Sequence, residues 1–204
     1  MIHVGIYLFD DVELLDFAGP IEVFTTAARV LARGRPRGEP PLFAVSTVAR
    51  GRGAVRSRAG LQVQPDHTLV DHPAFECIVV PGGVVDAELG AADLSAWIAA
   101  QARSARIVAS VCTGALLLAQ AGLLDDKEAT THWEDLDALR AVRPGRVQVV
   151  EGVRWVDAGA VVTSAGISAG IDMSLHLVER LHGRELAQRT ARQMDFDWRG
   201  GAND

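Results

Sequence analysis

Hydrophobic residues along the chain fall into two alternating kinds of segment. Short runs rich in β-branched residues predict buried strands, and longer segments with apolar positions every three or four residues predict helices. The predicted strands are 3–9, 42–48, 77–80, 107–111, 129–131, 147–150, 153–156 and 160–163. The predicted helices are 20–31, 92–103, 113–121, 134–141, 169–182 and 184–194. This alternation predicts an α/β fold, a doubly wound and largely parallel sheet with helices on both faces.

Turn residues divide these segments. Pro20, after Gly19, is expected to open the first helix, with the preceding residues in a turn or loop. Residues 54–63 are expected to form a small hairpin, and 34–41 a loop rich in Pro and Gly. Gly122 is expected to cap the helix that ends near residue 121. The chain has no repeats or linkers, so we expect a single domain over 1–204.

Cys112 lies between a predicted buried strand and a predicted helix. Ser110 and Gly114, two residues away on either side, are both small. This is the requirement of a nucleophile elbow, a tight strand-to-helix turn with no bulk beside the nucleophile. A helix N-terminus also favours a thiolate. The structural alternative is that Cys112 is only a small buried hydrophobe, as free cysteines usually are.

Asp16 and two glycines follow other predicted strands, and sites in such sheets form at the carboxyl ends of strands. We expect the Asp16 carboxyl to share a proton with Cys112, with a thiolate accepting a hydrogen bond from protonated Asp16 at rest. The alternative for Asp16 is a helix cap. The amides of Gly82 and Gly83 are expected to face developing negative charge, with Thr113 completing the pocket, although both glycines also suit an ordinary turn.

His132 and Cys77 are weaker candidates. His132 stands at a predicted strand end, where it either lines the Cys112 pocket or hydrogen-bonds to backbone. Cys77 opens a predicted strand and is expected to be packing. No spacing of His, Cys and Asp suggests a zinc site, and no glycine pattern suggests a nucleotide, so we expect neither a metal nor a cofactor.

Composition limits the partners. The 204 residues carry a formal net charge of −6, and 49% are hydrophobic. Basic residues cluster only at 29–37 and 50–58, so a nucleic-acid partner is not expected. No apolar run approaches a membrane span, and no basic leader or cleavage site opens the chain. With two cysteines and no disulfide framework, we expect a cytoplasmic protein.

Six motifs resemble the ThiJ/PfpI superfamily, whose fold is flavodoxin-like and similar to class I glutamine amidotransferases. They are Leu15-Asp-Phe-Ala-Gly-Pro20, Val80-Pro-Gly-Gly83, Ser110-Val-Cys-Thr-Gly114, Ala121-Gly-Leu-Leu124, Ala129-Thr-Thr-His-Trp133 and Thr163-Ser-Ala-Gly-Ile-Ser-Ala-Gly-Ile-Asp172. Within the superfamily the chain is most similar to the isonitrile hydratase (isocyanide hydratase) branch. That resemblance implies Cys112 as nucleophile, Asp16 as acid, Thr113 beside them, a small-molecule substrate and a homodimer.

Differences from other branches of the superfamily narrow the choice of activity. Protease-like members carry His directly after the nucleophile, where this chain has Thr113, and glyoxalase-type members usually carry Glu at the position of Asp16. The resemblance therefore implies a lyase that adds water to an isocyanide through a Cys112 thioimidate. The alternatives are a hydrolase or glyoxalase-like enzyme, a ligand-sensing domain related to AraC-type regulators, and a thiol redox or stress protein.

Overall fold

A seven-stranded sheet forms the centre of the computed structural model, which describes residues 1–33, 36, 38, 40–198 and 200. The strand order is β10-β11-β7-β6-β1-β2-β5. The strands are β1 (Ile2–Tyr7), β2 (Phe43–Ala49), β5 (His67–Thr68), β6 (Cys77–Val80), β7 (Ile107–Val111), β10 (Trp155–Asp157) and β11 (Val161–Ser164). Neighbouring strands run parallel except β10, which is antiparallel to β11. The prediction of a largely parallel sheet is confirmed.

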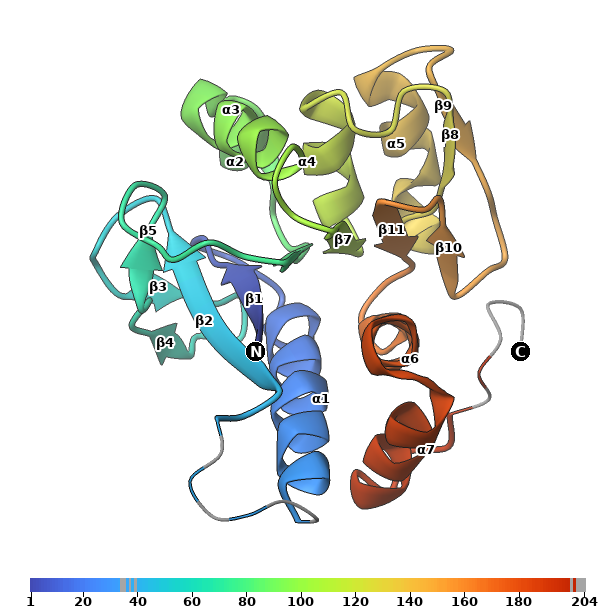
Figure 1. Ribbon diagram of the computed structural model, residues 1–204. Helices are drawn as coiled ribbons and strands as arrows, with labels where there is room; N and C mark the ends of the chain where they lie inside the picture. Colours follow the sequence, from blue (N-terminus) through green and yellow to red (C-terminus); the bar gives the residue numbers. More distant parts are fainter. Residues whose placement is uncertain (34–35, 37, 39, 199, 201–204) are drawn as a thin grey trace.

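Helices cover both faces of this sheet, as predicted (Figure 1). On one face lie α1 (Leu14–Ala32), α6 (Ala169–His182) and α7 (Arg184–Gln193), which pack on one another. On the other lie α2 (Asp86–Leu89), α3 (Ala92–Gln101), α4 (Gly114–Gln120) and α5 (Leu136–Val142), the last preceded by the short helix η1 (Trp133–Asp135). The fold is therefore doubly wound.

Two small sheets flank the main one. The strands β3 (Val55–Arg56) and β4 (Gln62–Val63) pair antiparallel and confirm the predicted hairpin. The strands β8 (Lys127–Ala129) and β9 (Val147–Val149) pair parallel. β8 begins two residues before its predicted position. The sequence did not predict β5 or α2, because elements of two and four residues are too short to show a periodic pattern.

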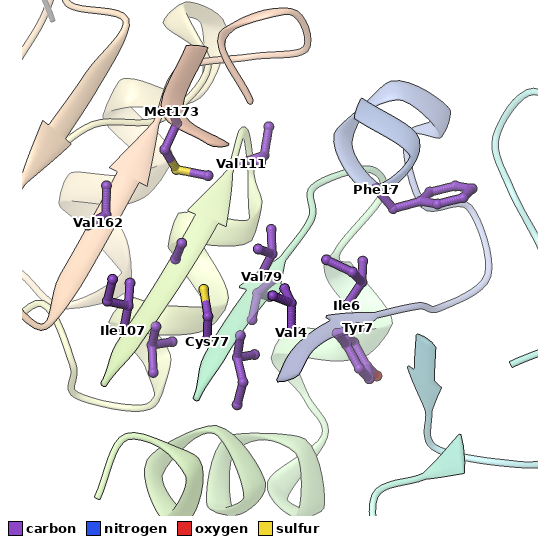
Figure 2. Packing of buried hydrophobic residues seen from close by; sticks show 14 of the residues in the cluster. Val4, Ile6, Tyr7, Phe17, Cys77, Val79, Ile107, Val111, Val162 and Met173 are labelled. Carbon is purple, nitrogen blue, oxygen red and sulfur yellow. The ribbon is translucent and has the colours of Figure 1, made fainter. Parts of the chain in front are cut away.

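The centre of the sheet is apolar on both faces. Val4, Ile6, Val79 and Val111 are buried in the middle strands and pack between the two helix layers (Figure 2). β-branched side chains suit strands that are covered on both sides, since they pack well on a pleated surface. This rigid core holds the carboxyl ends of β1, β6 and β7 side by side.

The first helix begins earlier than predicted. α1 starts at Leu14, and Pro20 lies inside it instead of opening it. Inside a helix, proline lacks one backbone N–H and crowds the carbonyl four residues earlier, and the burial of this segment against the rest of the fold offsets that cost. Phe17 is buried, and Gly19 lies so close to α6 that an added Cβ would be 3.1 Å from Cγ1 of Ile171. Asp16 is therefore in the first turn of a helix, not in a loop.

The predicted cap of α4 is confirmed. The helix ends at Gln120, and Gly122 follows with φ +78°, a left-handed conformation that favours glycine. The amide of Gly122 donates to the carbonyl of Ala119 at 2.9 Å. The predicted loop at 34–41 and the basic cluster at 29–37 lie partly outside the described residues.

Candidate functional site

Cys112 has a strained backbone at the junction of β7 and α4. Its φ is +56°, a conformation that non-glycine residues adopt rarely. A Cβ at Gly114 would lie 2.1 Å from the carbonyl oxygen of Val80, so only glycine fits there. The Cys112 amide donates to the Ser164 carbonyl at 3.1 Å, and the Thr131 hydroxyl donates to the Cys112 carbonyl at 2.7 Å. These features are those of the predicted nucleophile elbow.

Asp16 is fully buried beneath this elbow. Its Oδ2 accepts a hydrogen bond of 3.1 Å from the amide of Gly82, at the end of β6. Its other oxygen, Oδ1, is also buried and has no well-directed hydrogen bond from the described residues. A buried carboxyl oxygen without a partner is costly, so its presence needs an explanation.

The carboxyl of Asp16 and the thiol of Cys112 interact, because each affects the pKa of the other. Burial raises the pKa of Asp16 to about 7; the Gly82 amide opposes this rise, Glu13 adds to it, and a weak hydrogen bond with the Cys112 thiol opposes it. Burial also raises the pKa of Cys112 to about 12, and the charge of Asp16 adds to that rise. The Thr113 amide and hydroxyl oppose it. The structure thus brings Cys112, Asp16 and Thr113 together.

The raised pKa of the Cys112 thiol disfavours the expected resting thiolate. Burial and the charge of Asp16 raise the pKa of the thiol more than the Thr113 amide and hydroxyl lower it. Burial thus favours a neutral thiol, next to a carboxyl whose pKa is raised toward neutrality.

The two glycines shape the site instead of offering free amides. The Gly82 amide donates to Asp16, and the Gly83 amide donates to the Thr113 hydroxyl at 2.9 Å, so neither faces an open pocket as expected. The Thr113 hydroxyl is also 2.9 Å from the Gly83 carbonyl. A Cβ on Gly82 would lie 2.6 Å from the Thr113 amide and 2.8 Å from Cβ of Cys112. Close approach to the elbow is what requires glycine there.

His132 lies in the wall of a neighbouring cleft of about 530 Å³. Its Nδ1 accepts a hydrogen bond of 3.3 Å from the Glu134 amide. His132 therefore makes the hydrogen bond to backbone that was one of its two predicted roles. Thr131, next to it, contacts the Cys112 carbonyl. Neither Cys112, which is 8% exposed, nor Asp16 lines this cleft, so the nucleophile lies beside it and is not in its wall.

Several neighbours of Cys112 were not predicted. Thr131 and Ser164 hold its backbone, and the charge of Asp135 contributes to the raised pKa of its thiol. Thr131 and Ser164 lie within motifs that the sequence displays, but only the parallel pairing of β7 with β11 brings Ser164 to the elbow. Pairing over this separation leaves no local signal in the sequence.

The described residues contain no group of three or more His, Cys, Asp or Glu side chains placed to hold a metal ion. No helix in the described part of the chain combines the length and apolar character that crossing a bilayer takes.

A doubly wound sheet with a strained cysteine at the carboxyl end of a central strand, beside a buried carboxyl, defines the class of α/β proteins with a cysteine at a nucleophile elbow. A sequence model of the DJ-1/PfpI family matches residues 3–180, and the chain belongs to this family.

Similar proteins include both an enzyme and regulators. The chain is 36% identical to isonitrile hydratase of Pseudomonas putida over 96% of its own length and 78% of the enzyme. It is 34% identical to the HTH-type transcriptional regulator GbdR of Pseudomonas aeruginosa, over 90% of this chain but 48% of the regulator.

Solved structures share the fold. A ThiJ/PfpI family protein from Pseudomonas syringae has a TM-score of 0.82 at 28% identity, covering 96% of this chain and 75% of that one. DJ-1beta of Drosophila melanogaster has a TM-score of 0.80 at 20% identity, covering 97% and 99%.

Proposed function

We propose that this protein is a hydratase that adds water to an isocyanide and releases an N-substituted formamide. Cys112 is the nucleophile, Asp16 transfers the proton, and Thr113 supports the sulfur. The observation that carries the proposal is the pairing of the Cys112 thiol, on a strained backbone, with the buried carboxyl of Asp16. The 36% identity to an isonitrile hydratase over nearly the whole chain supports the choice of substrate.

The reaction balances with these two groups and water. As sulfur bonds to the terminal carbon of R–N≡C, Asp16 takes the thiol proton and passes it to that carbon, which gives the thioimidate R–N=CH–S–Cys112. Water then adds to the same carbon, with one proton moving to nitrogen. The C–S bond of R–NH–CH(OH)–S–Cys112 breaks, the sulfur recovers a proton, and R–NH–CHO leaves. Each step uses covalent catalysis with proton transfer by one neighbouring acid–base group.

The raised pKa values suit this sequence of steps. A carboxylate with a pKa of about 7 is a stronger base than an ordinary aspartate and is ionised about half the time at neutral pH. Once protonated, it is an acid of matching strength. The same carboxyl can therefore move the proton both when the thioimidate forms and when it breaks down.

The second candidate is a ligand-sensing domain, favoured by the 34% identity to a transcriptional regulator. A sensor needs the cleft but not the chemistry of Cys112. It would bind a small molecule with the same affinity when Cys112 is replaced, whereas an enzyme loses turnover.

The remaining alternatives have less support at this site. Hydrolysis of amides needs a group that protonates a leaving amine, and the residue after the nucleophile is Thr113, not His. A glyoxalase-like activity would convert methylglyoxal to lactate. A redox sensor would oxidise Cys112 with mild peroxide and show no turnover. We also propose, from the family resemblance, a cytoplasmic homodimer.

The test is an assay of formamide production from a panel of isocyanides, with lactate production from methylglyoxal assayed in parallel. We expect formamide from the wild-type protein and from Cys77→Ala, and none from Cys112→Ala. Turnover of an isocyanide by Cys112→Ala at the wild-type rate would refute the mechanism. Lactate without formamide would favour the glyoxalase alternative.

A further inference from the structure

The cleft beside the elbow has not been given a role by the mechanism. Its volume is about 530 Å³, large enough for a ring-sized organic group. The turn that follows β8, the loop before β10 and the segment that leads into α6 enclose it. Its lining includes Thr131, Trp133, Val153, Arg154 and Ile167.

The floor of this cleft adjoins the backbone of Cys112. The hydroxyl of Thr131, a lining residue, donates to the Cys112 carbonyl at 2.7 Å. Ala165, another lining residue, follows Ser164, whose carbonyl accepts the Cys112 amide. Two lining residues therefore connect the cleft to the backbone of Cys112. Thr131 does so directly, and Ala165 does so through Ser164, the residue before it.

Large apolar side chains are left partly in water at this cleft. Trp133 is 73% exposed and Ile167 is 39% exposed, although both are large hydrophobic residues. Ile167 also has φ +51°, which β-branched residues rarely adopt. Exposed apolar surface inside a concavity is typical of a site for an apolar ligand, which would cover it.

The charges around the cleft disfavour an anion. Arg154 is its one charged lining residue, and Asp172 pairs with its Nε at 2.7 Å. On the other wall, Nδ1 of His132 faces Asp135 at 3.5 Å and Glu134 at 3.8 Å. The single positive charge is therefore paired, and two carboxylates stand beside His132. The described lining therefore offers no unpaired cation to a carboxylate on the ligand.

We propose that this cleft binds the N-substituent of the substrate and selects neutral, apolar, ring-sized groups, with Trp133 as the specificity-determining residue. This inference rests on the proposed isocyanide hydratase function. The C–N–R axis of an isocyanide is linear, so when its carbon meets the sulfur of Cys112 the substituent projects away from the nucleophile. The adjoining cleft receives the substituent, which then covers the Trp133 ring.

The first experiment compares kcat/KM for phenyl isocyanide, methyl isocyanide and 4-isocyanobenzoate. We expect phenyl isocyanide to exceed each of the others by about tenfold or more, since a filled apolar pocket discriminates by roughly this factor. Trp133→Ala should lower kcat/KM for phenyl isocyanide about tenfold and have a much smaller effect on methyl isocyanide. Leu61→Ala, which shortens another exposed apolar side chain that lies outside the cleft, should change neither value. Equal losses for the two substrates in Trp133→Ala would overturn the inference.

A binding measurement separates this inference from the proposed function. Cys112→Ala is titrated with N-phenylformamide and N-methylformamide while tryptophan emission is followed. We expect a saturable change with N-phenylformamide only, and we expect its loss when Trp133→Phe is added. If no isocyanide is turned over but this change occurs, the proposed reaction fails and the apolar cleft stands. If isocyanides are turned over without this change, the cleft inference fails and the reaction stands.

Discussion

The two cysteines of this protein lie on neighbouring strands and have the same raised pKa, yet their surroundings differ. Cys77 opens β6, faces Val4 of β1 and Ile107 of β7 in register, and is fully buried in the apolar core (Figure 2). Cys112 follows the end of β7, in a left-handed conformation, next to Asp16 and Thr113. Burial raises the pKa of each thiol to about 12.

The comparison teaches that a low thiol pKa is not what distinguishes the candidate nucleophile. Both thiols hold their protons at neutral pH. Only Cys112 has a carboxyl nearby that can take the proton, and only Cys112 adjoins a cleft through its backbone neighbours. The neighbouring carboxyl and the adjoining cleft therefore distinguish Cys112, because a thiol alone in an apolar core has neither.

The largest expected difference between the two cysteines is in turnover. Cys112→Ser should lower kcat for isocyanide hydration by at least about 10⁴-fold, because no covalent intermediate forms readily. Cys77→Ser, the matched control on the adjacent strand, should keep kcat within about twofold of wild type provided that it folds. Formamide production measured by chromatography checks both. If kcat fell strongly in both variants although both were equally folded, turnover would not distinguish Cys112 from Cys77.

Removing the base should make Cys112 resemble Cys77. Asp16→Asn keeps the size of the side chain and should lower kcat/KM by about 10³-fold, within the range of general acid–base catalysis. Asp126→Asn changes a carboxylate that is 78% exposed and should leave kcat/KM unchanged. Steady-state kinetics at pH 8 checks the pair. Equal rates in wild type and Asp16→Asn would show that Cys112 needs no carboxyl.

The same substitution should stabilise the fold at high pH. The pKa of Asp16 is about 7 in the native protein, whereas an aspartate in an unfolded chain has a pKa of about 3.8. Between these values the native state holds a proton that the unfolded state has lost, so this group's contribution to stability falls as pH rises from about 4 to 7. Asp16→Asn does not titrate and should raise the free energy of unfolding by about 4 kcal/mol at pH 8. Urea unfolding at pH 5 and 8 tests this, and the gain should be smaller at pH 5.

The smallest expected effect is on the packing of Cys77. Cys77→Ala removes a fully buried sulfur from the core and should lower the free energy of unfolding by about 1 kcal/mol. Cys112→Ala removes a sulfur whose surroundings are polar and strained, and it should cost less. Thermal unfolding of the two variants compares them. A larger loss for Cys112→Ala would indicate that its sulfur mainly stabilises the core.

The sequence predicted the nucleophile elbow because the residues that define it stand close together in the chain. The strand 107–111, the cysteine and Gly114 stand within a few residues, and steric exclusion at Gly114 follows from that spacing. It also indicated that Asp16 and Cys112 meet, since the carboxyl ends of parallel strands share one edge of the sheet.

The protonation state, the start of α1 and the use of the glycine amides could not be predicted. Each depends on tertiary packing: burial raises the thiol pKa, contact of Gly19 with α6 keeps Pro20 inside a helix, and close approach at Gly82 and Gly83 occupies their amides. Such effects leave no periodic pattern along the chain.

The pH dependence of kcat/KM, measured in the wild-type protein and in Asp16→Asn, tests the central claim most directly: Asp16 must be ionised to take the proton of Cys112. The account predicts that kcat/KM of the wild type falls tenfold per pH unit below an apparent pKa near 7, and that the residual activity of Asp16→Asn lacks this decline. An unchanged decline in Asp16→Asn, or no decline in the wild type between pH 8 and pH 5, would contradict it.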